Sequence, residues 1–85
     1  MKLIRVQNNH LSLEFDPDQR SAVERALQEL DINLQRRSYP GSMVVRVCGV
    51  ELVLDADPLS LALISSNDAG DQILERVLKA CEEAN

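Results

Sequence analysis

Aromatic residues are nearly missing from this chain of 85 residues, which has one Phe, one Tyr and no Trp. The hydrophobic core must therefore be aliphatic, and folding of so short a chain removes only about 60–65% of the surface that the extended chain exposes. Separate cores form only in much longer chains. We therefore expect one domain, residues 1–85, with modest stability.

Long apolar runs are missing as well. No run approaches the roughly 18 residues that span a bilayer, and residues 1–16 lack the continuous apolar segment of a secretory signal peptide. Apolar residues make up 45% of the chain and charged residues 27%, which is ordinary for a globular protein and argues against disorder. The composition predicts a folded cytoplasmic protein with no membrane partner.

The residue types that carry most catalysis and metal binding are scarce. The chain has two cysteines and one histidine, which are too few for a disulfide framework, a four-ligand zinc site or a Ser-His-acid mechanism. The histidine, His10, falls in a predicted polar loop and is expected to be solvated. The three glycines are isolated and begin no phosphate-binding motif. We therefore predict that the chain is not an enzyme and uses no cofactor or metal ion.

Basic side chains are few in the second half of the chain. Residues 1–46 carry seven basic and six acidic residues, whereas residues 47–85 carry two basic and eight acidic ones, and the formal net charge of the chain is −5. Negative charge repels nucleic-acid phosphates and favours basic protein surfaces, although a solvated acidic face explains the same pattern.

Three segments have the pattern of β-strands. Residues 11–15 alternate apolar and polar side chains, as in a half-buried strand, and residues 2–6 are a plausible hairpin partner. The polar connection at residues 7–10 contains asparagines, which tolerate positive φ. Apolar and polar residues also alternate from Ile32 towards Arg37, which predicts a third strand.

Two segments have the apolar stripe of an amphipathic helix, residues 22–30 and 73–81. Asp16-Pro17 opens the first of them, because Asp accepts the free N–H groups of a first turn and Pro fits there. Asp57-Pro58 repeats this opening, so a short helix is favoured for residues 59–64, although the alternating leucines of that segment also fit a strand.

The segment between these helices predicts a hairpin whose register can be tested. With Cys48 and Gly49 as the two loop residues, apolar residues face apolar residues and Arg46 faces Glu51. The predicted pairs are Val47–Val50, Arg46–Glu51, Val45–Leu52, Val44–Val53 and Met43–Leu54. The predicted fold is thus α+β, with an antiparallel sheet of about five strands in the order ββαβββαα and two or three helices packed on one face.

In this register Val44 and Val53 lie beside Arg46 and Glu51 on the sheet face away from the helices. Another protein or a second copy of the chain would cover such an apolar patch, and scattered surface valines are the alternative interpretation. We predict a homodimeric protein-binding protein, such as an adaptor, chaperone, antitoxin, immunity protein or inhibitor, which also uses the acids of the last helix. The predicted partner-binding residues are Val44, Arg46, Glu51, Val53, Glu75 and Glu82.

A second hypothesis is a nucleic-acid-associated subunit. Three arginines, Arg36, Arg37 and Arg46, fall near adjacent strand ends, and Tyr39 in the intervening turn offers a ring for stacking. Binding without sequence preference needs a continuous basic groove with several aromatic residues, and this chain offers one aromatic beside an acidic half. Pairing of these arginines with acids such as Glu51 is the simpler explanation, so nucleic acid is the less favoured partner.

Overall fold

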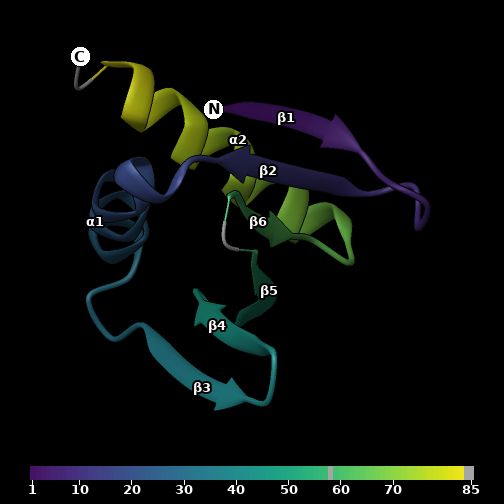
Figure 1. Cartoon of the computed structure of the whole chain (residues 1–85). Coiled ribbons are helices and arrows are strands. Elements are labelled where there is room, and N and C mark those ends of the chain that lie inside the picture. Colours follow the sequence, from purple (N-terminus) through teal and green to yellow (C-terminus); the bar gives the residue numbers. More distant parts are fainter. Residues whose placement is uncertain (58, 84–85) are drawn as a thin grey trace.

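A computed structural model describes residues 1–57 and 59–83. They form one α+β domain in which a six-stranded antiparallel sheet packs against two helices (Figure 1). The elements are β1 (Lys2–Arg5), β2 (Leu11–Phe15), the 3-10 turn η1 (Pro17–Gln19), α1 (Arg20–Leu30), β3 (Gln35–Tyr39), β4 (Ser42–Val47), β5 (Val50–Ala56), β6 (Leu61–Ile64) and α2 (Asp68–Glu83).

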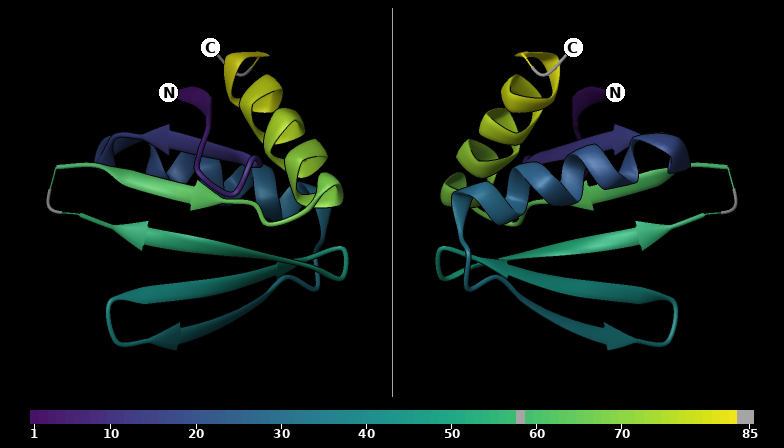
Figure 2. Two further views of the ribbon diagram at one scale, coloured as in Figure 1. Left: turned by 90° about the vertical axis from the view of Figure 1, so that its right-hand side faces the viewer. Right: turned by 90° about the vertical axis from the view of Figure 1, so that its left-hand side faces the viewer.

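The strands lie in the order β1-β2-β6-β5-β4-β3, and all neighbours are antiparallel. Strand β6 is the last to occur in the sequence and yet lies inside the sheet, between β2 and β5. It therefore joins the β1–β2 hairpin to the three strands β3, β4 and β5. Figure 2 shows both helices on the same side of the sheet, so the other face has no helical layer.

The core lies between the sheet and the two helices and is aliphatic, as the composition predicted, with Phe15 as its one aromatic member. Its buried strand residues are Leu13, Phe15, Val45, Val47, Leu52, Leu54, Leu61 and Leu63. Its buried helix residues are Val23, Ala26, Leu27, Ile73, Leu74, Val77 and Cys81. None of the helices in the described part of the chain is long and apolar enough to cross a membrane.

Both predicted hairpins are confirmed. In the β4–β5 hairpin every predicted pair is present, including Val44 with Val53 and Arg46 with Glu51. The loop residues Cys48 and Gly49 have φ values of 52° and 77°, as a two-residue turn with left-handed residues requires. In the β1–β2 connection Asn9 has a φ of 66°, so an asparagine adopts the positive φ that the sequence predicted for this loop.

The two amphipathic helices are also confirmed. Helix α1 follows Asp16-Pro17 after the single turn of η1, and the Asp16 N–H donates to Gln19 Oε1 at 2.9 Å. Helix α2 begins at Asp68, where the Asn67 side chain accepts the N–H of Gly70 at 2.7 Å and so satisfies one free donor of the first turn.

The short helix favoured for residues 59–64 is wrong. Residues 61–64 form strand β6, so the element order is ββαββββα, with six strands and two helices. Strand β6 pairs with β2 on one side and with β5 on the other, and a helix there would leave one edge of each of these strands unpaired. Two backbone hydrogen bonds between Asp57 and Ser60, of 2.9 and 3.3 Å, close the connection from β5. The predicted cap involves Pro58, which lies outside the described residues.

The third strand begins later than predicted, at Gln35 instead of Ile32. The Asp31 side chain accepts the N–H of Asn33 at 2.9 Å, so the chain turns immediately after α1. Ile32 lies in that turn and is 80% exposed. The strand then runs through Tyr39, which the sequence had placed in a turn, and only residues 40–41 form the connection to β4.

Candidate binding surface on the outer sheet face

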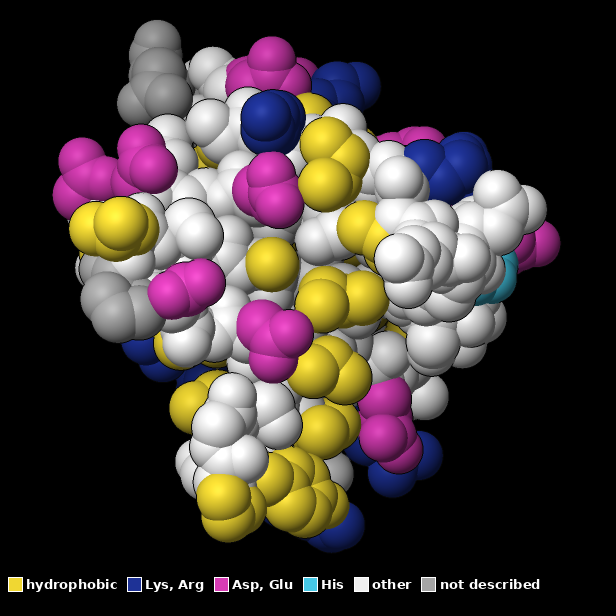
Figure 3. All heavy atoms as spheres, turned by 45° about the vertical axis from the view of Figure 1, so that its right-hand side comes forward, with side chains coloured by type: hydrophobic (Ala, Val, Ile, Leu, Met, Phe, Trp, Pro, Cys, Tyr) yellow, Lys and Arg dark blue, Asp and Glu magenta, His cyan; other side chains and the backbone are white. Residues whose placement is uncertain are grey.

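The sheet face opposite the helices, here called the outer face, carries a row of mostly apolar side chains. Because side chains alternate along a strand, every second residue of each strand points to this face. Figure 3 shows apolar side chains running across it, with acidic and basic side chains on both sides. The strand pairings place one residue of each strand in a line, here called the central row: Ile4, Ser12, Ile64, Val53, Val44 and Arg37.

The central row is partly open to solvent. Val53 is 38% exposed, and Ile4, Ile64 and Val44 are partly buried by their neighbours. A second line flanks the row on one side and is mostly charged or polar, with Ala62 as its apolar member. It consists of Lys2, Glu14, Ala62, Asp55, Ser42 and Tyr39. An apolar centre with a polar border is the usual composition of a protein–protein interface.

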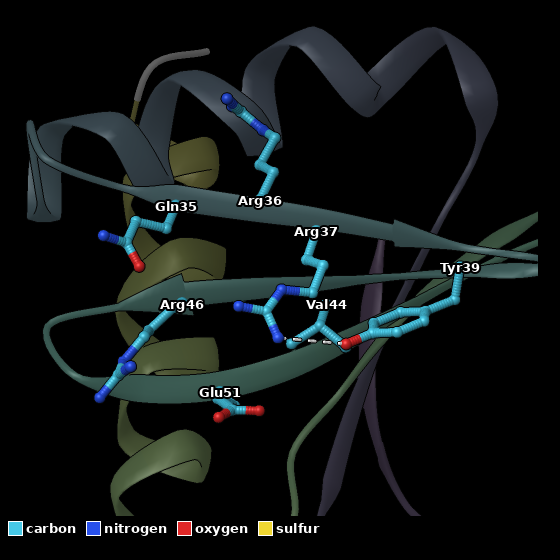
Figure 4. Close-up of a pocket in the computed structure, with 7 residues that line it drawn as sticks. All are labelled: Gln35, Arg36, Arg37, Tyr39, Val44, Arg46 and Glu51. Atoms are coloured by element: carbon cyan, nitrogen blue, oxygen red, sulfur yellow. Dashed lines mark hydrogen bonds between the residues drawn. The ribbon is translucent and has the colours of Figure 1, made fainter.

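One end of the outer face is hollowed over strands β3, β4 and β5. The hollow has a volume of about 440 Å³ and is drawn in Figure 4. Its lining residues are Gln35, Arg36, Arg37, Tyr39, Val44, Arg46 and Glu51. Arg36 alternates with its neighbours on β3 and points towards the helices, so Arg37 and Arg46 are the two guanidinium groups on the outer face itself.

Among the described residues, no acid forms an ion pair with the arginines of the hollow. Within residues 1–57 and 59–83, the ion pairs join His10 to Asp68 and Asp71, and Arg20 to Glu24. Arg46 and Glu51 face each other in the register, but the predicted ion pair between arginine and acid does not form. Arg37 Nη1 donates to the Tyr39 hydroxyl at 3.4 Å, and this hydrogen bond, with a smaller effect of Glu51, raises the pKa of Arg37.

The structure brings together only part of the predicted partner-binding set. Val44, Arg46, Glu51 and Val53 share the outer face, as the register required. Glu75 and Glu82 are exposed on α2, in the helical layer on the other side of the core, so one partner cannot readily cover both groups. All four residues considered for nucleic acid, Arg36, Arg37, Tyr39 and Arg46, line the hollow, although the Arg36 side chain points towards the helices.

The sequence interpretation missed Ile4, Ser12 and Ile64 of the central row and Gln35 of the hollow. Ile4 and Ile64 occupy the central row only because β6 is a strand that pairs with β2. The alternation within residues 61–64 was a signal for a strand, but nothing in the sequence indicated which strand it would join. Gln35 enters the hollow because it lies opposite Arg46 in the pairing of β3 with β4.

A second cluster of polar groups lies where the β1–β2 loop meets α2. His10 Nδ1 is 3.0 Å from Asp71 Oδ2 and 3.9 Å from Asp68 Oδ1, and Leu11 N–H donates to Asp71 Oδ1 at 2.8 Å. His10 is therefore hydrogen-bonded and partly buried, not a solvated loop residue as predicted. The side chains of His10, Asp68 and Asp71 offer possible metal-ligand atoms that lie within 4.8 Å of one another. Because both oxygens of Asp71 already have partners, the cluster is accounted for as a link between loop and helix.

The pKa of Asp71 reflects this link. Partial burial acts to raise it, but hydrogen bonds from the Leu11 backbone and from the His10 and Ser65 side chains more than offset that effect. The pKa is lowered from 3.8 to about 2.

No protein-family model, curated protein or solved structure gives a match to this chain.

Proposed function

We propose that this chain is a non-catalytic cytoplasmic protein that acts by binding another protein through the outer face of its sheet. The observation that supports the proposal is the central row, in which four of the six strands contribute an aliphatic side chain to a face that neither α1 nor α2 covers. Apolar surface that is removed from water stabilises a complex by about 25 cal/mol per Å². A contiguous apolar patch with a polar border is typical of an interaction site.

Photocrosslinking at the centre of the row tests this proposal. A chain with benzoylphenylalanine at position 53 is expected to crosslink to a protein in its native host, because Val53 is 38% exposed in the middle of the row. The control places benzoylphenylalanine at position 28, on the exposed side of α1. The position-53 adduct should disappear in the Val44→Glu background. Equal adducts at both positions, or none at position 53, would contradict the proposal.

Nucleic acid is the second candidate partner, because Arg37, Tyr39 and Arg46 meet at the hollow. The net charge of −5 and the presence of Glu51 in the lining oppose it. Fluorescence anisotropy with a 12-nucleotide single strand at two salt concentrations distinguishes the candidates, since an affinity that depends on phosphate contacts falls steeply with salt. Absence of binding at 50 mM salt eliminates this function.

A further inference from the structure

We propose that the hollow receives a carboxylate of the bound protein, and that apolar residues next to this carboxylate lie along the central row. The inference rests on the proposed function and specifies the chemistry of the partner. The partner would present an acidic side chain, or the carboxylate of a chain end, flanked by apolar residues.

The register places two guanidinium groups at one site. Arg37 on β3 pairs with Val44 on β4, and Gln35 pairs with Arg46, so these four outer-face residues form a square with the arginines at opposite corners. Diagonal neighbours of this kind are about 7–8 Å apart, which long side chains span easily. Figure 4 shows Arg37, Arg46 and Glu51 extending from the same side of the sheet. The sheet therefore fixes the bases of both arginines.

These guanidinium groups have hydrogen-bond donors to spare. Each has five N–H donors, and among the described residues the one side-chain hydrogen bond they make is that of Arg37 to the Tyr39 hydroxyl. The planar fork of a guanidinium group matches the two oxygens of a carboxylate. Two guanidinium groups with unused donors at one hollow are suited to binding an oxyanion.

Charge at the hollow also favours an anionic ligand. Among the residues that line the hollow, Arg37 and Arg46 stand against one acid, Glu51, so the hollow is locally positive on a chain whose net charge is −5. Glu51 lies opposite Arg46 in the register without forming an ion pair. A carboxylate from a partner would neutralise the remaining positive charge, which is the complementarity expected at a specific interface.

The surroundings of the hollow favour a single carboxylate over a chain of phosphates. Beyond Val44 the central row continues into Val53 and Ile64, and the acids Glu14 and Asp55 stand beside it. Successive phosphates would meet these acids, whereas apolar side chains would lie on the row. Since strands are about 4.8 Å apart, an extended segment of about five residues reaches from β3 to β6.

Hexanoate, a carboxylate with an apolar tail, tests the site without knowledge of the partner. In an NMR titration of the whole chain, hexanoate at millimolar concentration is expected to shift the side-chain N–H signals of Arg37 and Arg46 and the methyl signals of Val44 and Val53. Its affinity should exceed that of acetate at least three-fold, because the tail adds apolar contact. R37Q and R46Q should each weaken binding at least five-fold, whereas R76Q, an exposed position on α2, should leave it unchanged.

Several results would overturn the inference. The first is that hexanoate up to 50 mM shifts the signals of neither arginine. The second is that R46Q binds hexanoate as tightly as the unchanged chain does. The third is that inorganic phosphate binds as tightly as hexanoate without shifting the valine methyl signals. Binding of the 12-nucleotide strand that both arginine variants abolish would assign the hollow to nucleic acid instead. If the chain binds hexanoate but forms no crosslink at position 53, the proposed function is wrong and the carboxylate site stands. If it forms the crosslink but does not bind hexanoate, only the carboxylate site is wrong.

Discussion

At the scale of single residues, Asp71 shows how one side chain can hold two elements together. It stands in the first turn of α2, where a negative charge is favourable, and it accepts hydrogen bonds from His10 and from the backbone of Leu11 in the neighbouring loop and strand. Sequence alone indicated the position at the helix start. The contact with residues sixty positions earlier depends on the packing of α2 against β2 and was not predictable.

The lowered pKa of Asp71 predicts acid sensitivity. Its value of about 2 in the folded chain, against an ordinary 3.8, means that folding favours the ionised carboxylate. This contribution to stability is therefore fully present above about pH 5 and is lost as the pH falls from about 4 towards 2. Urea unfolding at pH 6 and at pH 3 measures the free energy of unfolding that is lost between the two pH values, and this loss should be smaller for Asp71→Asn than for the unchanged chain. At pH 6, Asp71→Asn should already be about 1–2 kcal/mol less stable than the unchanged chain.

Asp68→Asn is the matched control, because the Asp68 side chain is 96% exposed and comes no closer to His10 Nδ1 than 3.9 Å. It should follow the pH profile of the unchanged chain. If Asp71→Asn and the unchanged chain lost the same free energy of unfolding between pH 6 and pH 3, Asp71 would not be the group responsible.

At the scale of elements, local pairing was predictable and long-range pairing was not. The β4–β5 hairpin could be aligned because its pairs lie within thirteen residues of one another in the sequence and the predicted pairs match in character. The segment at residues 59–64 was ambiguous, because a helix opening and a leucine alternation pointed to different structures. Its conformation was decided by β2, almost fifty residues earlier, whose second edge needs a partner.

Substitution of Ala62 tests the strand assignment. Its backbone lies between β2 and β5, so Ala62→Pro should cost about 3 kcal/mol or more by removing a ladder hydrogen bond inside the sheet. Ala62→Thr should change stability by less than about 1 kcal/mol, because β-branched residues suit strands and the side chain points to the outer face. Chemical denaturation gives both values. A destabilising Thr together with a tolerated Pro would be inconsistent with strand β6.

At the scale of the whole molecule, the chain separates two surfaces of different character. The outer face combines an apolar row with a hollow that holds arginines, and the acids Glu75 and Glu82 lie on the helical layer. The valines of the row followed from alternation in one hairpin. The full row and the position of the hollow depend on the order of strands in the sheet, which pairs segments about fifty residues apart and leaves no local sign in the sequence.

Self-association is the companion prediction at this scale. Six strands about 4.8 Å apart, each roughly 17 Å long, give a face with a flat area of the order of 500 Å² per copy, which is small for a stable interface and predicts a weak dimer. Sedimentation at tens of micromolar should detect this dimer. Val44→Glu should shift it to monomer by placing a charge in the central row, whereas Gln28→Glu on α1 should not. A monomer throughout would exclude a second copy as the occupant of the face.

The central position of β6 has a consequence for synthesis on the ribosome. Residues 1–60 emerge before β6 and contain a β1–β2 hairpin and a three-stranded β3–β4–β5 unit that have no strand in common, and each has an unpaired edge where β6 will pair. The four residues of β6 then close both edges in one step. Until they emerge, the nascent chain has two unpaired strand edges that can pair with other chains, and protection from aggregation during translation matters most in that interval.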